Sequence, residues 1–361
     1  MSQTWLRVGG GLAIFALIAL IGLAALGGLG FEEALDTFTL AMVVAIPAGV
    51  LTYALIEYAQ TRRIDSITRQ FDTRTLVLMP VAMALNIVLG TAVASALKIP
   101  IYLDSIGTIL VAALAGPLAG AATGFLTNVV WTYLAPPPFG SPFAVPFAMV
   151  AVVVGLLAGS FARWGWMRPR PNSSGRQLLI GGALTIGAVA VMVVLALRAW
   201  LAAPDGDDLA PKADETAFVI LGWVALLLVV GTAIGLIVLL VRRRDLAVAY
   251  IVAAGVITGL VAAFLAAPIS AGIFGGVTGS GADFVIAAFR QAGADLEQAV
   301  LGQSLISDPV DKVITYFVVY LILGAMASRT KARFPQGEYL LPLPDERSSV
   351  KVEDAAQPES D

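Results

Sequence analysis

Charged and polar side chains interrupt the long apolar runs of this chain at a few places, and they could bind a small ligand. Asp104 lies directly before an apolar run that begins at Ile106. With Ser105 beside it, Asp104 could cap the helix formed by that run. It could equally present a carboxylate to a ligand, because ionisable residues at membrane depth usually serve a function. The sequence leaves both roles open, and they are compatible.

Asn128 and Trp131 lie about one helical turn apart in the next apolar run, so they share a helix face. A buried amide is costly unless it is paired, so Asn128 should face other helices or a cavity. A plain contact between helices is the alternative. Trp131 and Tyr133 are also typical of a membrane interface. Since only Trp131 shares the face of Asn128, it is the candidate for stacking on a ligand.

The letters DPVDK at 308–312 predict the start of a helix. Asp308 is expected to be the N-cap, Pro309 the first helical residue and Asp311 an acidic residue of the first turn. Lys312 and Tyr316 lie one turn apart and could instead point into a pocket.

The glycine-rich segment FGGVTGSGAD (274–283) resembles a phosphate-binding loop only superficially. It lacks the lysine of such loops, and it is predicted on the outer face, where ATP is absent. Its glycines permit a loop to fold tightly over a ligand, although a plain flexible connection fits as well. Thr278 is a candidate contact, whereas Asp283, three residues after Ser280, also fits a capping box.

Composition excludes several classes of protein. Hydrophobic residues make up 58% of the 361 residues and charged ones 13%, which is typical of a polytopic membrane protein. The chain has no cysteine and no histidine, which excludes disulfides, imidazole bases and Cys/His zinc sites. It has no GxxxxGK[ST] phosphate loop either. We predict no catalytic site, no metal, no cofactor and no binding of nucleic acid.

Hydropathy predicts an all-α membrane protein with about ten transmembrane segments. Their ranges are 7–29, 38–59, 76–97, 106–116, 118–135, 143–162, 177–199, 217–241, 246–267 and 310–328. The connections alternate between basic and acidic, so the positive-inside rule places both termini on the cytoplasmic side of the cell membrane. This alternation requires that 106–116 counts as a crossing and that the chain turns at Gly116-Pro117 on the cytoplasmic face.

The run 106–116 is too short for an ordinary span, since it gives roughly 16 Å of helix against about 30 Å of hydrocarbon core. Either the bilayer is thinner around it or its start is sunk below the outer surface. In the second case residues 98–105 dip into the protein and line a cavity, because irregular backbone at that depth must be sheltered from lipid.

Two other segments stand apart from the spans. Residues 268–307 form a long outer connection, and apolar residues at helical spacing within 284–301 favour an ordered lid over a flexible linker. From Pro335 onward the chain is polar and acidic, and we predict a disordered tail.

Three of these segments together resemble the substrate-binding (S) components of energy-coupling factor transporters, which take up vitamins and similar micronutrients. The segments are IPIYLDSIGTILVAALAGPLAGAATGFLTN, FGGVTGSGADF and SDPVDKVITYFVVYLIL. The resemblance implies a core of six spans, with the substrate under the outer loops 98–105, 136–142 and 268–307. It also implies two kinds of partner, a transmembrane coupling subunit and two cytoplasmic ATPase subunits.

On this resemblance the chain divides into an extra N-terminal hairpin with a basic loop (1–75), the first part of the core (76–162), an inserted hairpin (163–245), the second part of the core (246–333) and the tail (334–361). An even number of added crossings preserves the orientation of the core. The Ala-x-x-x-Ala pattern by which S components often dock on the coupling subunit has no clean match at 82–86. The N-terminal histidine of nickel and cobalt members is absent as well.

The function that the resemblance implies is capture of a small organic micronutrient without chemistry on it. The expected contacts are Tyr102, Asp104, Asn128, Trp131, Thr278, Asp283, Lys312 and Tyr316. Carboxylates beside aromatic residues suit a cationic or ring-containing nutrient such as thiamine, whereas Lys312 suits an anionic one such as a flavin phosphate or pantothenate. The rival hypotheses are a membrane sensor or scaffold with a ligand pocket, and an intramembrane enzyme that relies on carboxylates.

Overall fold

The computed structural model describes residues 2–25, 31–96, 100–137, 139–170, 245–291 and 293–342, together with single residues and short stretches between 173 and 242. The described residues form helices and contain no strand. The main helices are α1 (Ser2–Ala24), α2 (Phe31–Thr61), α4 (Thr73–Gly90), α5 (Ile106–Ala115), α6 (Pro117–Tyr133), α7 (Ala148–Arg163), α10 (Ala247–Phe274), α11 (Ala282–Gln291) and α12 (Leu296–Ala325). Shorter ones are α3 (Asp65–Thr68), η1 (Arg69–Phe71), η2 (Thr91–Ala96), η3 (Val145–Phe147), α13 (Ser328–Lys331) and η4 (Gly337–Leu340). The predicted spans 177–199 and 217–241 lie largely outside the described residues.

Three helical stretches of the described chain are long and apolar enough to cross a bilayer: Thr73–Ala94, Val145–Arg163 and Ala247–Phe274. Only 28% of the most apolar window of Thr73–Ala94 is buried within the protein. Apolar side chains that face outwards on this scale are expected where lipid covers a helix. These helices indicate an all-helical membrane protein, in agreement with the composition.

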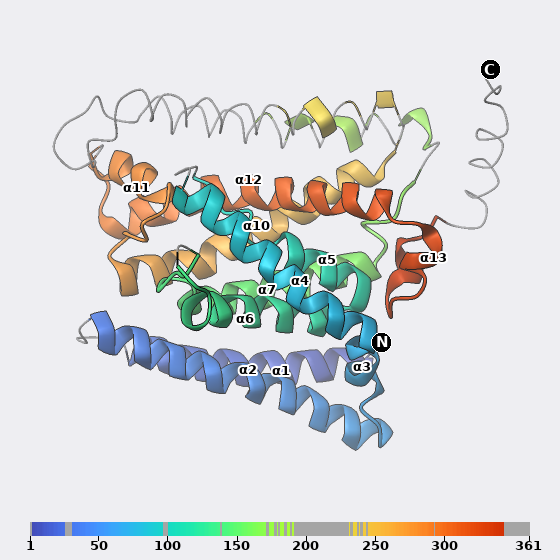
Figure 1. The fold of residues 1–361 in the computed structure, drawn as a ribbon, viewed down its shortest axis with the longest axis horizontal. Coiled ribbons are helices and arrows are strands. Elements are labelled where there is room, and N and C mark those ends of the chain that lie inside the picture. Colours follow the sequence, from blue (N-terminus) through green and yellow to red (C-terminus); the bar gives the residue numbers. More distant parts are fainter. Residues whose placement is uncertain are drawn as a thin grey trace.

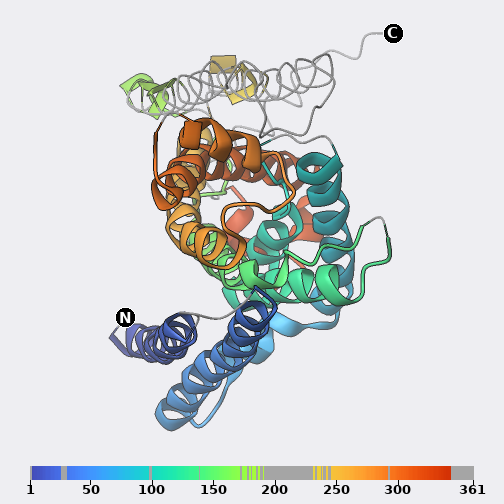
Figure 2. The same ribbon diagram turned by 90° about the vertical axis from the view of Figure 1, so that its left-hand side faces the viewer.

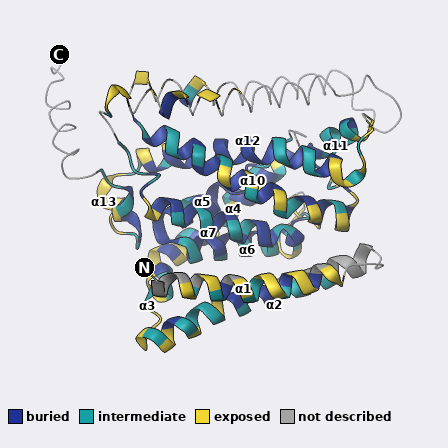
Figure 3. Cartoon of the chain, turned by 180° about the vertical axis from the view of Figure 1, so that it is seen from behind, coloured by how far each residue is buried: buried dark blue, intermediate teal, exposed yellow. Residues whose placement is uncertain are grey.

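The helices form a bundle of α4, α5, α6, α7, α10 and α12, and α1 and α2 run as a pair along one side of it (Figure 1). Figure 2 shows this pair standing outside the bundle. The pair reaches the bundle where α2 contacts η3, α7 and α10. Buried residues concentrate inside the bundle, whereas α1 and α2 leave much of their surface exposed (Figure 3).

The short helix α5 lies in the interior of the bundle, and all but one of its residues are buried. Its bounds agree closely with the prediction of 106–116. Gly107 permits close packing on α4, since a Cβ at this position would lie 2.2 Å from the carbonyl oxygen of Ala82. Asn86 of α4 accepts a hydrogen bond from the Gly107 amide at 2.7 Å and donates to Thr108 at 2.9 Å and to Thr127 at 3.3 Å. One buried amide therefore joins α4, α5 and α6.

The chain turns between α5 and α6 at Gly116, whose φ of +129° lies in the region that favours glycine. The Oε1 atom of Gln70 in η1 accepts a hydrogen bond at 2.8 Å from the amide of Leu118 at the start of α6. The backbone N–H of Gln336, which precedes η4, donates to the carbonyl of Leu114 at 2.8 Å. The predicted turn at Gly116-Pro117 therefore exists, and it lies beside η1 and η4.

The outer connection 268–307 differs from its prediction. α10 continues to Phe274 and α12 already begins at Leu296, so the described connections between helices are only 275–281 and 293–295. Between them, α11 packs on the start of α12 through Ile286, Ala299 and Val300. The periodicity in 284–301 thus belongs to two helices that fold back on each other.

The tail also begins later than predicted. Gln336 is buried and donates from its side chain to the carbonyl of Gly159 in α7 at 2.8 Å. Leu340 is 1% exposed. The prediction of disorder from Pro335 is therefore wrong up to residue 342, because these residues close the end of α7. Residues 343–361 lie outside the described part of the chain.

Candidate functional site

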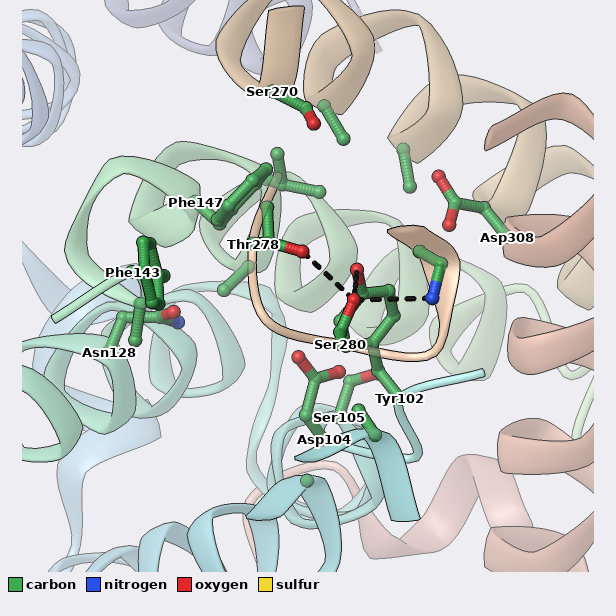
Figure 4. A pocket seen from close by; sticks show the side chains of 18 of the residues that line it. Tyr102, Asp104, Ser105, Asn128, Phe143, Phe147, Ser270, Thr278, Ser280 and Asp308 are labelled. Carbon is green, nitrogen blue, oxygen red and sulfur yellow. Dashed lines mark hydrogen bonds between the residues drawn. The ribbon is translucent and has the colours of Figure 1, made fainter. Parts of the chain in front are cut away.

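A cavity lies between α6, α7, α10 and α12, and residues of the segments 101–105, 141–144 and 275–281 border it (Figure 4). Its volume is about 120 Å³, counted over the positions that the centre of a water-sized molecule can occupy. A single water needs about 10–15 Å³ on this measure, so the space suits a small organic molecule. Six of the predicted contacts line it: Tyr102, Asp104, Asn128, Trp131, Thr278 and Lys312.

Asp311 holds the segment 101–105 in place at the edge of this cavity. Its side chain is 1% exposed, and its Oδ1 atom accepts hydrogen bonds from the amides of Tyr102 at 3.1 Å and Leu103 at 2.7 Å. Leu103 has a φ of +52°, an unfavourable conformation for a leucine. The two hydrogen bonds to a buried carboxylate stabilise this strained segment.

Lys312 already has partners. Its Nζ atom lies 2.5 Å from Oδ2 of Asp311 and donates to Oγ of Ser105 at 2.7 Å. Asp104 is the third neighbour, with its Oδ1 atom 3.6 Å from Nζ. The Asp104 side chain keeps 30% exposure where it borders the cavity. The ammonium therefore pairs more closely with the carboxylate of Asp311 than with that of Asp104.

The prediction that Asp308 is a helix N-cap is wrong. The N-cap of α12 is Asp295, which accepts from the amide of Gln298, so Asp308 lies in the interior of the helix and lines the cavity. Pro309 is likewise an internal residue of α12. A proline inside a helix removes one hydrogen bond and kinks the backbone. Gly259 of α10 leaves room for it, since a Cβ there would lie 2.3 Å from the Cα atom of Pro309.

Asp104 is also not the N-cap that the sequence allowed. Ser105 holds that position before α5, and its side chain makes no capping hydrogen bond. Asp104 instead turns towards the cavity beside Ser105 (Figure 4). Of the two roles left open by the sequence, the structure retains a carboxylate that faces a pocket.

The glycine-rich segment crosses the cavity. Gly275, Gly276 and Gly279 have φ values of +57°, +79° and +71°, which glycine adopts without strain. Thr278 and Ser280 line the cavity, and the hydroxyl of Ser280 lies 3.1 Å from that of Tyr102. Figure 4 shows these hydroxyl groups converging. Hydroxyl contacts therefore link this segment to the segment 101–105.

Asp283 supports the same segment from outside the cavity. Its Oδ1 atom accepts from the amide of Thr278 at 3.0 Å, and its Oδ2 atom accepts from the amide of Gly279 at 2.7 Å. Asp283 does not line the cavity, so the structure favours the structural role that the sequence left open. It shapes the segment that carries Thr278 and Ser280.

Tyr316 likewise lies away from the cavity. It is fully buried, and its hydroxyl pairs with Thr258 of α10 at 3.0 Å. Tyr316 follows Lys312 by one turn of α12. Its ring packs between helices, with its centroid 6.5 Å from that of the Phe161 ring. Tyr316 thus contributes to the packing of α12 rather than to the lining.

An aromatic wall forms the side of the cavity near α6 and α7. Trp131 is 6% exposed and donates from Nε1 to the carbonyl of Phe139 at 2.7 Å. Phe147 stacks on Phe274 with ring centroids 5.7 Å apart, and Phe143 meets the same ring edge-on at 5.4 Å. Asn128 lies beside Phe143 in Figure 4 and donates to the carbonyl of Gly124 at 3.0 Å. Asn128 and Trp131 do share a face, as the helical spacing predicts.

Comparison with protein-family models, with curated proteins and with solved structures gives no match for this chain. The candidate site therefore rests on the geometry given above.

Sequence reasoning missed several lining residues. Phe143 and Phe147 precede α7 and carry no polar signal. Ser304, Asp308 and Lys312 recur at intervals of four, which places them on one helix face. That spacing indicates a polar stripe on one helix that already exists before Pro309. The helix start predicted at Asp308 hides this signal.

Burial changes the acid–base behaviour of two groups in the segment 101–105. It raises the pKa of the Tyr102 phenol, with Ser280 acting in the opposite direction, so Tyr102 stays neutral at physiological pH. It also raises the pKa of the Asp104 carboxyl above its usual value, and the Lys312 ammonium opposes that shift. Asp104 therefore takes up a proton at a higher pH than a carboxylate in water does.

Proposed function

We propose that this chain is the membrane-embedded substrate-binding subunit of an energy-coupling factor importer for a small organic micronutrient. The observation that carries the proposal is the cavity, which six residues named from the sequence line and three connecting segments border. A largely apolar pocket with a few convergent polar groups is the usual form of a small-molecule site. The chain binds the nutrient without chemistry, and a separate coupling subunit and two ATPase subunits supply the energy.

The proposed topology has ten crossings with a core of six and with both termini in the cytoplasm. The turn at Gly116 supports it. Gln70 accepts a hydrogen bond from Leu118 just after this turn, and Gln336 donates one to Leu114 just before it. Both glutamines belong to segments assigned to the cytoplasmic face. The 101–105 segment at the other end of α5 borders the cavity. The cavity is then open towards the outer face in this topology.

Docking on the coupling subunit should use a face of α4 other than the one that carries Ala82 and Asn86. Ala82 and Asn86 are buried where α4 packs on α5. Val77 and Val81 are 67% and 64% exposed on the same helix. We assign the outward face of α4 to lipid or to the coupling subunit.

The experiment that tests the proposal is native mass spectrometry of the protein purified in mild detergent, followed by identification of any compound that is released. A stoichiometric nutrient-sized compound supports the proposal and identifies the substrate. An empty protein that co-purifies with a signalling or lipid-handling partner and with no ATPase contradicts it, and favours the sensor or scaffold alternative.

Asp104→Ala is expected to weaken binding of the released compound about tenfold to a hundredfold, because a hydrogen bond to a charged group contributes about 1.5–3 kcal/mol. Isothermal titration with the purified variant measures this. Glu297→Gln is the matched control, since it removes an exposed carboxylate of α12 outside the cavity. A thermal unfolding midpoint close to that of the unmodified protein shows that the variant folds, and unchanged affinity removes Asp104 from the site.

A further inference from the structure

Acidic side chains outnumber basic ones around the cavity. Lys312 is the cation among the lining residues, and its ammonium is 2.5 Å from the carboxylate of Asp311. Asp104 and Asp308 also line the cavity. Three carboxyl groups thus surround one ammonium, so this end of the cavity favours a bound cation over a bound anion.

Two buried polar atoms on the cavity side of α12 have no partner in the described part of the chain. They are Oδ2 of Asp308, a hydrogen-bond acceptor, and Nε2 of Gln303, a donor. Both residues are more than nine-tenths buried and line the cavity. A buried carboxylate oxygen without a donor is costly, so a group that supplies a positive charge or an N–H there is strongly favoured.

The opposite side of the cavity is aromatic. Figure 4 shows Asp308 on one side and Phe143 and Phe147 on the other, with Thr278 between them. Aromatic ring faces attract cations and stack on flat rings. A ligand that spans the cavity would thus meet carboxylate at one end and aromatic surface at the other.

We infer that the ligand is an organic cation, with a protonated amine or a charged nitrogen heterocycle directed at Asp308 and Asp104 and a flat or apolar part against Phe143 and Phe147. This inference rests on the proposed function and specifies its substrate class. The sequence left open whether the ligand is a cation or an anion. The structure favours the cation, because the ammonium of Lys312 is already paired with the carboxylate of Asp311. The amide of Gln303 then donates to an acceptor atom of the ligand.

The test measures thermal stabilisation and affinity of the purified protein with three probes of different charge at pH 7.5. They are thiamine as the cation, riboflavin as a neutral ring compound and pantothenate as the anion. Each is compared on the unmodified protein, on Asp308→Asn and on the control Glu297→Gln. The charge of any compound that co-purifies with the protein is determined in parallel.

We expect the cation to bind most tightly, or the co-purified compound to be a cation, and Asp308→Asn to weaken that binding about tenfold to a hundredfold. Glu297→Gln should leave the affinity unchanged. Binding of pantothenate or riboflavin in preference to thiamine, or a co-purified anion, overturns the cation while leaving the proposed function intact. An affinity for the cation that Asp308→Asn does not change also overturns the inference. If no probe binds and the purified protein is empty, both the cation and the proposed function are contradicted.

Binding of the cation should weaken as the pH falls, because protonation of Asp104 and of Asp308 removes negative charge from the cavity. The raised pKa of Asp104 moves this loss to a higher pH than for an ordinary carboxylate. The charged and titratable groups that act on Asp104 here are Lys312 and Asp311 of α12. Asp308 also faces the cavity, and burial raises the pKa of its carboxyl to about 8, so Asp104→Asn should make the profile less steep rather than flat. Titrations between pH 4 and 8 measure the effect. A profile that is flat in the unmodified protein, or equally steep in Asp104→Asn, contradicts it.

Discussion

Asp311→Asn is expected to destabilise the protein by about 3–5 kcal/mol, as measured for the loss of one member of a buried ion pair. The change removes the negative charge 2.5 Å from the ammonium of Lys312 and leaves that ammonium buried, with Asp104 as its remaining carboxylate at 3.6 Å. It also weakens the acceptor for the amides of Tyr102 and Leu103. The strained segment 101–105 should then lose its order together with the ion pair.

Two measurements test this prediction: the thermal unfolding midpoint in detergent, and the rate of hydrogen exchange at the amides of Tyr102 and Leu103. The double variant Asp311→Asn with Lys312→Met should regain part of the stability, because it no longer buries an unpaired charge. Glu297→Gln, an exposed carboxylate on the same helix, should stay within about 0.5 kcal/mol of the unmodified protein. A similarly small effect for Asp311→Asn, with unchanged exchange, would show that the ion pair does not hold the segment.

Asn86→Leu is expected to cost about 3 kcal/mol in free energy of unfolding. Asn86 is fully buried, and its side chain is hydrogen-bonded to the Gly107 amide and to the hydroxyls of Thr108 and Thr127. Leucine has a similar volume but no polar atoms, so the Gly107 amide loses its buried acceptor. An unsatisfied buried group costs about 1–3 kcal/mol, and the Thr108 hydroxyl loses a donor as well. The junction of α4, α5 and α6 should loosen.

The same unfolding measurements check this variant. Val81→Leu serves as the control, since Val81 is 64% exposed on the same helix and its replacement leaves the junction intact. The prediction fails if Asn86→Leu unfolds at the midpoint of Val81→Leu. Because α5 follows the segment 101–105 directly, Asn86→Leu should also lower affinity at the cavity, whereas Val81→Leu should not.

Local sequence was enough to predict α5 and its turn. Residues 104–105 precede an uninterrupted apolar run, and Gly116-Pro117 ends it, so both ends carry their own signals. The glycines at 275, 276 and 279 permit a tightly folded segment, and the structure gives them positive φ values. These signals depend on neighbouring residues alone. Six of the eight contacts predicted from the sequence line the cavity.

The tertiary structure decided the roles of Asp308, Asp283 and Tyr316. Asp308-Pro309 has the local pattern of a helix start, but Gly259 of α10 makes room for a proline inside α12, and the helix begins at Leu296 instead. Asp283 turned to the backbone of its own loop rather than to the cavity. Tyr316 shares a helix with Lys312, yet its hydroxyl meets Thr258 of α10. The outcomes for Asp308 and Tyr316 each depend on a residue of α10, which local spacing does not specify. The contacts of Asp283 are local, and only the packed bundle shows that this residue lies outside the cavity.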